Sequence, residues 1–452
     1  MAVSHQWFLQ WSAPAPYFSD ISSEFKKVSP DWNVLDNNRK YIKPYEHPTV
    51  NNGRFRSRTH VPNYKETKFE REKPHIDDYV PANVLPLGLE IYGSRIWVTI
   101  PSWRKGVPAT LATVSRSGGT TSPKLKPYPD WNFHRGFNKG SNCTGLTSVF
   151  RLNIDNCGRL WVLDSGQIDS QDSPKQICPP SIIVFDLQTD TPIARYIIPE
   201  KYVLQDSLYS NIIVDTRTED CSDLHVYIAD TWRFGLLVFR ESDESFWRFS
   251  HHLFYPDPLA SNYTLHGLNF QWSDGIFGLA LSPYDNYNER ILYFHSMSSY
   301  REFYVKTSVL RDEFRANNSA ADFKILGESR GLFGQSSASA IDRQGVMFYG
   351  LVTRDSIGCW DIRKPYQRKN TGQVAKDPTT LIFPNDIKID QEKRQSVWVI
   401  SNRLPMFQAG PLDPEDYNYR IMYADTQEAV RGTVCDPKLH LITSGQNNYL
   451  KH

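Results

Sequence analysis

The chain has 452 residues, with 51 Lys and Arg against 50 Asp and Glu, so its formal net charge is +1. This balance excludes a general attraction to nucleic acid or anionic membranes, and no run of about 18 or more apolar residues predicts a transmembrane helix. With 40% hydrophobic and 13% aromatic residues the chain can fill a large core, and its 29 Pro and 25 Gly favour strands and turns over long helices.

The N-terminal segment, residues 1–79, is predicted to lie outside the main domain. No basic start followed by an apolar run marks a signal peptide there. Between Asn37 and Lys73, ten Lys and Arg stand against four Asp and Glu without apolar periodicity. This predicts a basic, partly disordered arm, with a binding patch for an acidic partner as the alternative. A strand that closes the main domain is expected near Phe25 to Trp32.

A pattern recurs along residues 80–437: a short strand, a turn rich in Gly, Asp or Asn, and an apolar strand around an aromatic residue. Spacings of 64, 66, 66, 55 and 50 residues separate the aromatics, which leaves room for about four short strands in each unit. No sustained 3.6-residue periodicity supports a helical repeat. We predict an all-β fold, a six-bladed β-propeller over 80–437, with a C-terminal tail at 438–452. The recurring aromatics are Trp97, Trp161, Tyr227, Tyr293, Phe348 and Trp398.

Six cysteines are spread along the chain without a C-x-x-C pair, which disfavours a zinc ribbon or a thioredoxin-like site and leaves their disulfide pairing open. N-x-[ST] sequons at Asn142, Asn262 and Asn317 predict glycosylation. Together these features favour a secreted protein, although no signal peptide is visible. The cysteines are Cys143, Cys157, Cys178, Cys221, Cys359 and Cys435.

Several long motifs, in a fixed order, resemble the yellow / major royal jelly protein family of insects over most of the chain. The resemblance implies a six-bladed propeller and, in most members, secretion. It also implies one of several functions: conversion of dopachrome in melanin formation, binding of biogenic amines such as serotonin, or a nutrient or cuticle-pigmentation role. The motifs are Leu85–Glu90, Val98–Thr110, Arg151–Gly166, Cys178–Leu187, Tyr227–Asp230, Trp272–Pro283, Pro384–Lys388 and Ser401–Arg403.

Polar residues beside the inner strands are the first candidates for a binding site, because ligands of propellers bind near the central channel. The resemblance places Asn385 and Asn402 at positions that contact the amine in amine-binding members, and Leu404 where such a binder has an aromatic ring. Asp230 and Trp232 complete the predicted ligand-binding set. Asp164 is a further strand-end candidate, equally well explained as a turn cap.

Dopachrome conversion moves a proton from carbon to oxygen, which requires a base and a group that stabilises charge on the quinone oxygens. Asp386 and Glu90 are the predicted bases and Arg403 the predicted polarising group. His266 is a third possible base, or a hydrogen-bonded structural residue. No nucleophile elbow, zinc motif, P-loop or dinucleotide fingerprint occurs, and no cofactor or metal is predicted.

The leading hypothesis is a secreted pigmentation protein that converts dopachrome to a dihydroxyindole. The competing hypotheses are a non-catalytic binder of serotonin or catecholamines and a structural pigmentation protein. A calcium-dependent lactonase or esterase is a further alternative, with Glu90, Asn385 and Asp386 supplying some of the oxygen ligands. The partner is in each leading case a small aromatic amine or catechol derivative, not a nucleic acid.

Overall fold

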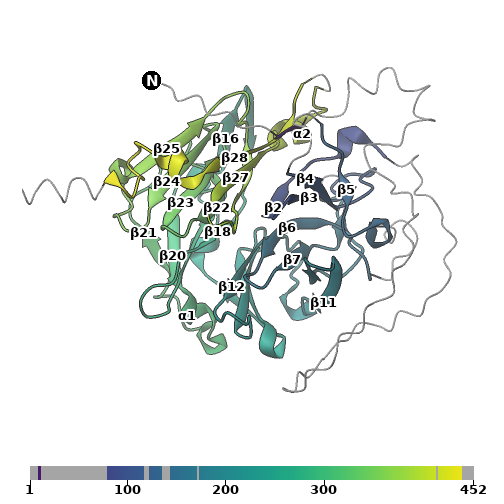
Figure 1. The fold of residues 1–452 in the computed structure, drawn as a ribbon, viewed down its shortest axis with the longest axis horizontal. Coiled ribbons are helices and arrows are strands. Elements are labelled where there is room, and N and C mark those ends of the chain that lie inside the picture. The colour runs from purple at the N-terminus through teal and green to yellow at the C-terminus, as the bar shows by residue number, and fades with distance from the viewer. Residues whose placement is uncertain are drawn as a thin grey trace, which may run out of the picture.

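Six four-stranded antiparallel sheets are arranged in a ring about a central axis, which confirms the predicted six-bladed β-propeller (Figure 1). The computed structural model describes residues 9–11, 79–116, 122–134, 143–170, 173–413 and 416–439. The innermost strand of each sheet lies at the channel and contacts the innermost strands of the two neighbouring blades. The basic arm at 37–73 and the tail predicted at 438–452 lie outside the described residues, except for residues 438 and 439.

The blades follow one another in chain order. Blade 1 contains β2 (Gly88–Tyr92), β3 (Arg95–Thr99), β4 (Leu111–Ser115) and β5 (Lys126–Pro127), and blade 2 contains β6 (Val149–Ile154), β7 (Arg159–Asp164), β10 (Ser181–Asp186) and β11 (Thr191–Ile197). Blade 3 contains β12 (Tyr209–Thr216), β13 (Leu224–Asp230), β14 (Gly235–Arg240) and β15 (Ser245–Ser250), and blade 4 contains β18 (Ile276–Leu281), β19 (Ile291–Ser296), β20 (Glu302–Lys306) and β21 (Lys324–Leu326). Blade 5 contains β22 (Ser336–Ile341), β23 (Val346–Leu351), β24 (Ser356–Asp361) and β25 (Thr371–Lys376), and blade 6 contains β26 (Pro384–Ile389), β27 (Ser396–Ser401), β28 (Tyr419–Asp425) and β1 (Leu9–Trp11).

Smaller elements decorate the ends of the blades. The hairpin β16 (Asn262–Leu265) and β17 (Leu268–Gln271) precedes blade 4, and the pair β8 (Gln167–Ile168) and β9 (Lys175–Gln176) lies within the loop between β7 and β10. The α-helices described are short: α1 (Thr307–Leu310), α2 (Leu404–Ala409) and α3 (Thr426–Val430). We call the end where the inner strands begin the upper end, and the end with the first hairpin of each blade the lower end.

The recurring aromatics found in the sequence all lie in the second strand of a blade, and all six are buried. A carboxylate near the turn after the inner strand anchors three of them, because a buried N–H or O–H needs an acceptor. Trp161 Nε1 donates to Asp155 at 2.9 Å, Tyr227 Oη to Asp215 at 3.0 Å, and Trp398 Nε1 to Asp390 at 2.9 Å. The repeat is therefore a packing and hydrogen-bonding unit, which explains its spacing.

An N-terminal strand completes blade 6. β1 pairs antiparallel with β28, with Leu9 opposite Ile421 and Trp11 opposite Tyr419. The sheet thus joins the two ends of the chain, since its other three strands come from the C-terminal part. The strand found here is Leu9–Trp11, and the stretch from Phe25 to Trp32, in which we expected it, lies outside the described residues.

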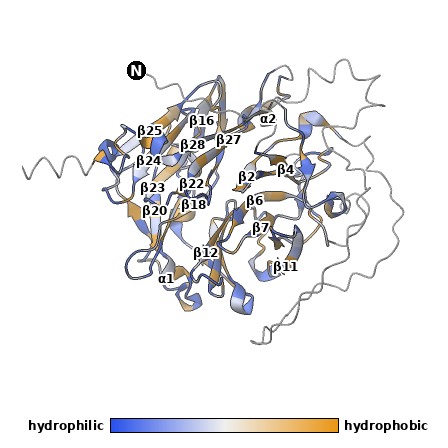
Figure 2. Cartoon of the chain, in the orientation of Figure 1, coloured by the Kyte–Doolittle hydropathy of each residue, from blue (hydrophilic) through white to orange (hydrophobic). Residues whose placement is uncertain are grey.

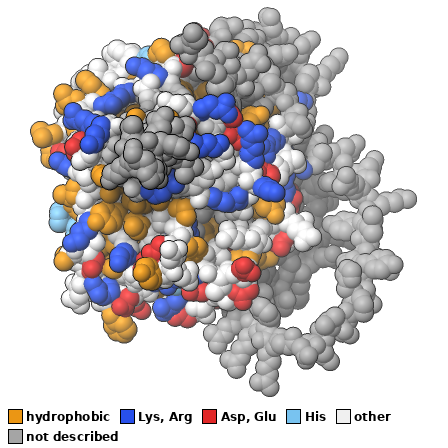
Figure 3. All heavy atoms as spheres, turned by 60° about the vertical axis from the view of Figure 1, so that its left-hand side comes forward, with side chains coloured by type: hydrophobic (Ala, Val, Ile, Leu, Met, Phe, Trp, Pro, Cys, Tyr) orange, Lys and Arg blue, Asp and Glu red, His pale blue; other side chains and the backbone are white. Residues whose placement is uncertain are grey.

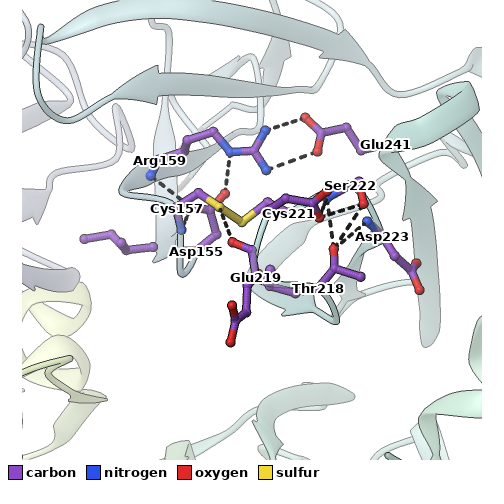
Figure 4. Close-up of a disulfide and its surroundings, with 12 residues drawn as sticks. Asp155, Cys157, Arg159, Thr218, Glu219, Cys221, Ser222, Asp223 and Glu241 are labelled. Carbon is purple, nitrogen blue, oxygen red and sulfur yellow. Dashed lines mark hydrogen bonds and ion pairs between the residues drawn. A yellow bond between two sulfur atoms is a disulfide. The ribbon is translucent and has the colours of Figure 1, made fainter. Parts of the chain in front are cut away.

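All six cysteines are paired, as Cys143–Cys178, Cys157–Cys221 and Cys359–Cys435. The second bond joins the β6–β7 hairpin of blade 2 to the β12–β13 hairpin of blade 3 at the lower end (Figure 4). The third ties the segment after α3 to β24 of blade 5, so the C-terminal chain crosses from blade 6 to its neighbour. Each bond restricts loops that would otherwise gain entropy on unfolding.

Apolar residues concentrate in the strands and polar residues in the connecting loops (Figure 2). On the face over blades 4 and 5, side chains of both charges lie between apolar ones, in keeping with the net charge of +1 (Figure 3). Among the residues described, no helix is long and apolar enough to cross a membrane.

Candidate functional site

Five of the inner strands bulge near their upper ends, and in four of them the pairing skips a single residue. In β6 the pairing with the second strand shifts register between Val149 and Arg151. The pairing shifts at the corresponding positions of β12, β18 and β26. A bulge interrupts the alternation of side chains between the two faces of a sheet. Bulges therefore often direct a side chain toward a binding site. The residues at these bulges, Phe150, Ser210, Phe277 and Asn385, all line one cavity at the upper end.

Immediately below this layer, the guanidinium of Arg151 lies in the channel. The side chain is fully buried, and its Nη2 donates to Asn385 Oδ1 at 2.5 Å and to the Asn385 carbonyl at 3.2 Å. Its Nε lies 3.5 Å from Asp386 Oδ2. Gly88 leaves the space for it, since a Cβ there would lie 3.1 Å from Arg151 Cδ and closer still to Thr99. Arg151 thus links blade 2 to blade 6 and separates two cavities.

The upper cavity has a volume of about 280 Å³ and a largely aromatic wall. Trp103 and Phe150 contact each other with ring centroids 5.5 Å apart. The ring centroid of Trp272 lies 4.6 Å from that of Phe270 and 5.8 Å from that of Phe383. Because Phe270 lies on β17, the β16–β17 hairpin helps to position Trp272. A flat aromatic ligand would find ring faces and edges on several sides. The lining includes Trp103, Phe150, Trp232, Trp272, Asp274, Phe277, Asn385, Leu404 and Gln408.

Asp274 is the carboxyl group of the upper cavity. It precedes β18, and its Oδ1 accepts a hydrogen bond from Trp232 Nε1 at 3.1 Å. Loss of hydration raises the pKa of Asp274 to about 6, against the smaller opposing effect of the Trp232 hydrogen bond. A carboxyl group with this pKa changes its protonation state near neutral pH, as a general base or acid requires.

The lower cavity, about 430 Å³, lies on the other side of Arg151 and is lined by the lower halves of the inner strands and the hairpins that follow. Its lining includes Glu90, Asn153, Asp155, Asp386 and Lys388. Burial raises the pKa of Glu90 to about 7, although Lys388 acts to lower it. The two predicted bases, Glu90 and Asp386, therefore face the lower cavity and not the aromatic one.

The structure divides the predicted site residues among three places. Asn385, Leu404 and Trp232 line the upper cavity, whereas Asp386 and Glu90 line the lower one. Asp230, Asn402 and Arg403 line neither of these cavities.

The last three residues have structural partners. Asp230 is buried, accepts from Leu208 N at 3.0 Å and forms an ion pair with Arg248 at 2.9 Å. Asn402 donates to the Pro86 carbonyl at 2.9 Å.

Arg403 pairs with Asp416 at 2.5 Å in the loop between β27 and β28. Asp164 accepts from the backbone N–H groups of Thr147 and Ser148, as a turn cap does, and His266 contacts Asp355 at 3.0 Å.

A profile of the family described as "Major royal jelly protein" matches residues 147–435, which span five blades and most of the site. The chain belongs to the major royal jelly protein family. This agrees with the resemblance seen in the sequence motifs.

A dopaminechrome tautomerase of Drosophila melanogaster is 43% identical to this chain over 379 residues. The match covers 82% of this chain and 81% of the relative. Protein yellow of Drosophila erecta is 40% identical over 362 residues, covering 79% of this chain and 66% of the relative. A solved virginiamycin B lyase from Staphylococcus aureus superposes with a TM-score of 0.40 at 10% identity, over 76% of this chain and 95% of the lyase, a likeness too low to bear on function.

Asn385 and Asp386, two of the residues considered for a calcium site of the lactonase type, are not arranged to bind the ion. Asn385 Oδ1 and Asp386 Oδ2 are both directed to the Arg151 guanidinium, which supplies the positive charge in the channel. Among the described residues, no group of three or more His, Cys, Asp or Glu side chains is arranged to hold a metal ion.

Sequence reasoning missed Arg151, Asp274 and the tryptophans Trp103 and Trp272. Asp274 could have been found, because it lies in the Trp272–Pro283 motif just before the inner strand β18, where polar residues were the first candidates. Arg151 carried no comparable signal, since its partners lie more than 200 residues away along the chain.

Replacing Arg151 with Met tests its place in the channel. Because Asp386 would keep only backbone donors while buried, we expect Arg151→Met to reduce the free energy of unfolding by about 3–5 kcal/mol. Urea and thermal unfolding measure the loss. The double variant Arg151→Met, Asp386→Asn should recover part of it, and a single variant as stable as the wild type would contradict the ion pair.

Proposed function

We propose that this protein converts dopaminechrome, or a closely related indoline quinone, to a 5,6-dihydroxyindole in the upper cavity. The proposal is supported by the 43% identity to a dopaminechrome tautomerase. The observation that carries it is Asp274, a carboxyl group with a pKa near 6 in the wall of an aromatic cavity. Asp274 takes the role that sequence reasoning gave to Asp386 and Glu90.

The reaction is an isomerisation and needs no oxidant. Two protons leave the saturated carbons of the five-membered ring, and each quinone oxygen takes up one, while the electrons of the two C–H bonds form the new ring double bonds. A base beside the ring would accept each proton in turn and return it to oxygen. In this proposal Asp274 is that base. The hydrogen bond from Trp232 Nε1 to its Oδ1, at 3.1 Å, fixes the position of the carboxyl group.

In this proposal Asn385 stabilises charge on a quinone oxygen. Its Oδ1 is taken by Arg151, so the group left to contact a ligand is its Nδ2 amide, a donor. The positive charge of Arg151 beside this amide strengthens its polarity. Donors aimed at developing oxygen charge lower the barrier of such proton transfers.

The cavity favours a substrate without a carboxylate. None of the described residues that line it is Lys or Arg, and its one charged side chain is Asp274. Dopachrome carries a carboxylate that would find no cationic partner there and would be repelled by Asp274 when ionised. Dopaminechrome lacks this group, so we infer that it is the better substrate of the two.

A non-catalytic binder of aromatic amines is the second candidate function, and the same carboxyl group favours it. An ammonium group could pair with Asp274 while its ring contacts Trp232 and Trp272. Leu404 provides apolar contact there but no ring for stacking. Turnover separates this function from the first.

We also propose that the protein is secreted and glycosylated. Three disulfides are typical of an oxidising compartment, and Asn262 and Asn317 are exposed. Asn142 lies outside the described residues. Loss of mass on N-glycosidase treatment of protein from a secretory host would test the glycans, and an unchanged mass would rule them out.

The substitution Asp274→Asn tests the proposed base. It keeps an acceptor for Trp232 but cannot take up a proton, so we expect kcat for dopaminechrome to fall by about 10²-fold or more. The assay follows the loss of visible absorbance of freshly made dopaminechrome, with the uncatalysed rate subtracted.

Asp206→Asn is the matched control, since Asp206 is exposed and has a positive φ of 62° that Asn tolerates. Full activity of Asp274→Asn would refute the assignment. A wild-type rate equal to the uncatalysed rate, combined with tight amine binding, would establish the binder instead. Dopachrome, run in parallel, should give at least a tenfold lower kcat/KM.

The pH profile gives a second test. A base must be ionised to act, so kcat/KM should rise with pH through about 6 and then level off, because the pKa of Asp274 is raised to that value. Asp274→Asn should lose this inflection in any residual activity. An inflection near the ordinary carboxyl value of about 4 would show that another group is the base.

A further inference from the structure

The lower cavity is a separate compartment whose polar wall plays no part in the proposed reaction. At about 430 Å³ it is larger than the upper cavity, from which the Arg151 layer separates it. Its wall is built from all six inner strands or the turns beside them, so it lies on the propeller axis.

Two charged side chains face each other in this cavity without forming a complete pair. Glu90, on β2, is only 4% exposed, and Lys388 lies on β26. Lys388 Nζ is 3.7 Å from Glu90 Oε2, which is beyond hydrogen-bond distance. Buried charges normally have close partners, because an unpaired one is costly.

Both groups keep unused hydrogen-bonding capacity. The Lys388 ammonium has three donors, of which one goes to the Leu152 carbonyl at 2.7 Å. Glu90 accepts at 3.2 Å from Ile91 N and at 3.4 Å from Asn153 Nδ2, and within the described part of the chain most of its lone pairs have no close donor. A cationic donor therefore lies beside a carboxyl group that is anionic above its raised pKa of about 7.

Ser339 provides an independent sign of a ligand. It lies on β22, lines the same cavity and is 5% exposed, yet its hydroxyl has no hydrogen-bond partner among the residues that the structure describes. Buried hydroxyls are nearly always satisfied, so an orphan hydroxyl at a cavity wall indicates a missing partner.

The wall is also pre-formed. Asp155 lines the cavity, and its Oδ2 forms an ion pair with Arg159 Nε at 2.6 Å. Arg159 Nη1 in turn forms an ion pair with Glu241 Oε1 of blade 3 at 2.8 Å (Figure 4). The disulfide Cys157–Cys221 joins the same two blades beside them. A ligand binding here would spend little free energy on ordering the wall.

We propose that the lower cavity is a second binding site, for a small zwitterion of the α-amino acid type, whose carboxylate pairs with Lys388 and whose ammonium pairs with Glu90. An amino acid carries both charges on one carbon, so it can lie antiparallel to the Glu90–Lys388 pair. Four alternating charges then neutralise one another, and no net charge is buried. A ligand with a single charge would pair with one of these two side chains and have the same sign of charge as the other.

Isothermal titration calorimetry of the full chain with glycine, L-leucine and L-tyrosine tests this site. At least one should bind at millimolar or lower concentration. Glu90→Gln and Lys388→Met should each weaken binding at least tenfold, whereas the exposed matched controls Glu313→Gln and Lys306→Met should not. Both cavity variants should retain dopaminechrome turnover, so failure of this site and failure of the proposed reaction can be told apart.

A comparison on the wild type keeps the test decisive if a variant does not fold. The methyl ester of the binding amino acid lacks the carboxylate charge, and its N-acetyl form lacks the ammonium. Each should lose at least tenfold in affinity. Absence of binding by all three amino acids, or equal binding of the ester or N-acetyl form, would overturn the proposal.

Discussion

A guanidinium buried on the axis of the propeller is the constraint on which the rest of the site depends. Arg151 reaches from blade 2 to Asn385 and Asp386 on blade 6, the two blades that flank blade 1. Burial lowers its pKa, and Asp386 opposes this shift. A charge in such a position must keep its partners, so the relative placement of the inner strands is fixed around it.

The same residue gives the channel two compartments with different chemistry. Above it, aromatic side chains and one carboxyl group suit a flat, neutral or cationic ring. Below it, charged and amide groups suit a small polar ligand. A propeller provides such separate environments because each inner strand contributes residues to both ends of the channel.

The fold could be predicted from the sequence because it repeats. Each buried aromatic of the second strand, such as Trp161 or Trp398, marks one blade, and in three blades its carboxylate partner lies 6 to 12 residues earlier in the chain. These are local interactions that recur from blade to blade. The closing strand β1 was misplaced because three residues that pair with β28 have no such period.

The site was harder to predict for two physical reasons. Bulges turn the neighbours Asn385 and Asp386 toward opposite compartments, so residues adjacent in sequence do not share a site. Arg151 depends on contacts distant in the chain, which no local pattern reveals. Asn385, Leu404 and Trp232 were nonetheless found at the upper cavity, because loops at inner-strand ends converge there.

In the proposed function, aromatic ligands bind above Arg151, beside Asp274. A crystal structure of the protein with serotonin, an aromatic amine that cannot tautomerise, tests this most directly. We expect the indole ring against Trp232 and Trp272, with the ammonium within hydrogen-bond distance of Asp274. An indole found in the lower cavity beside Glu90 would contradict it.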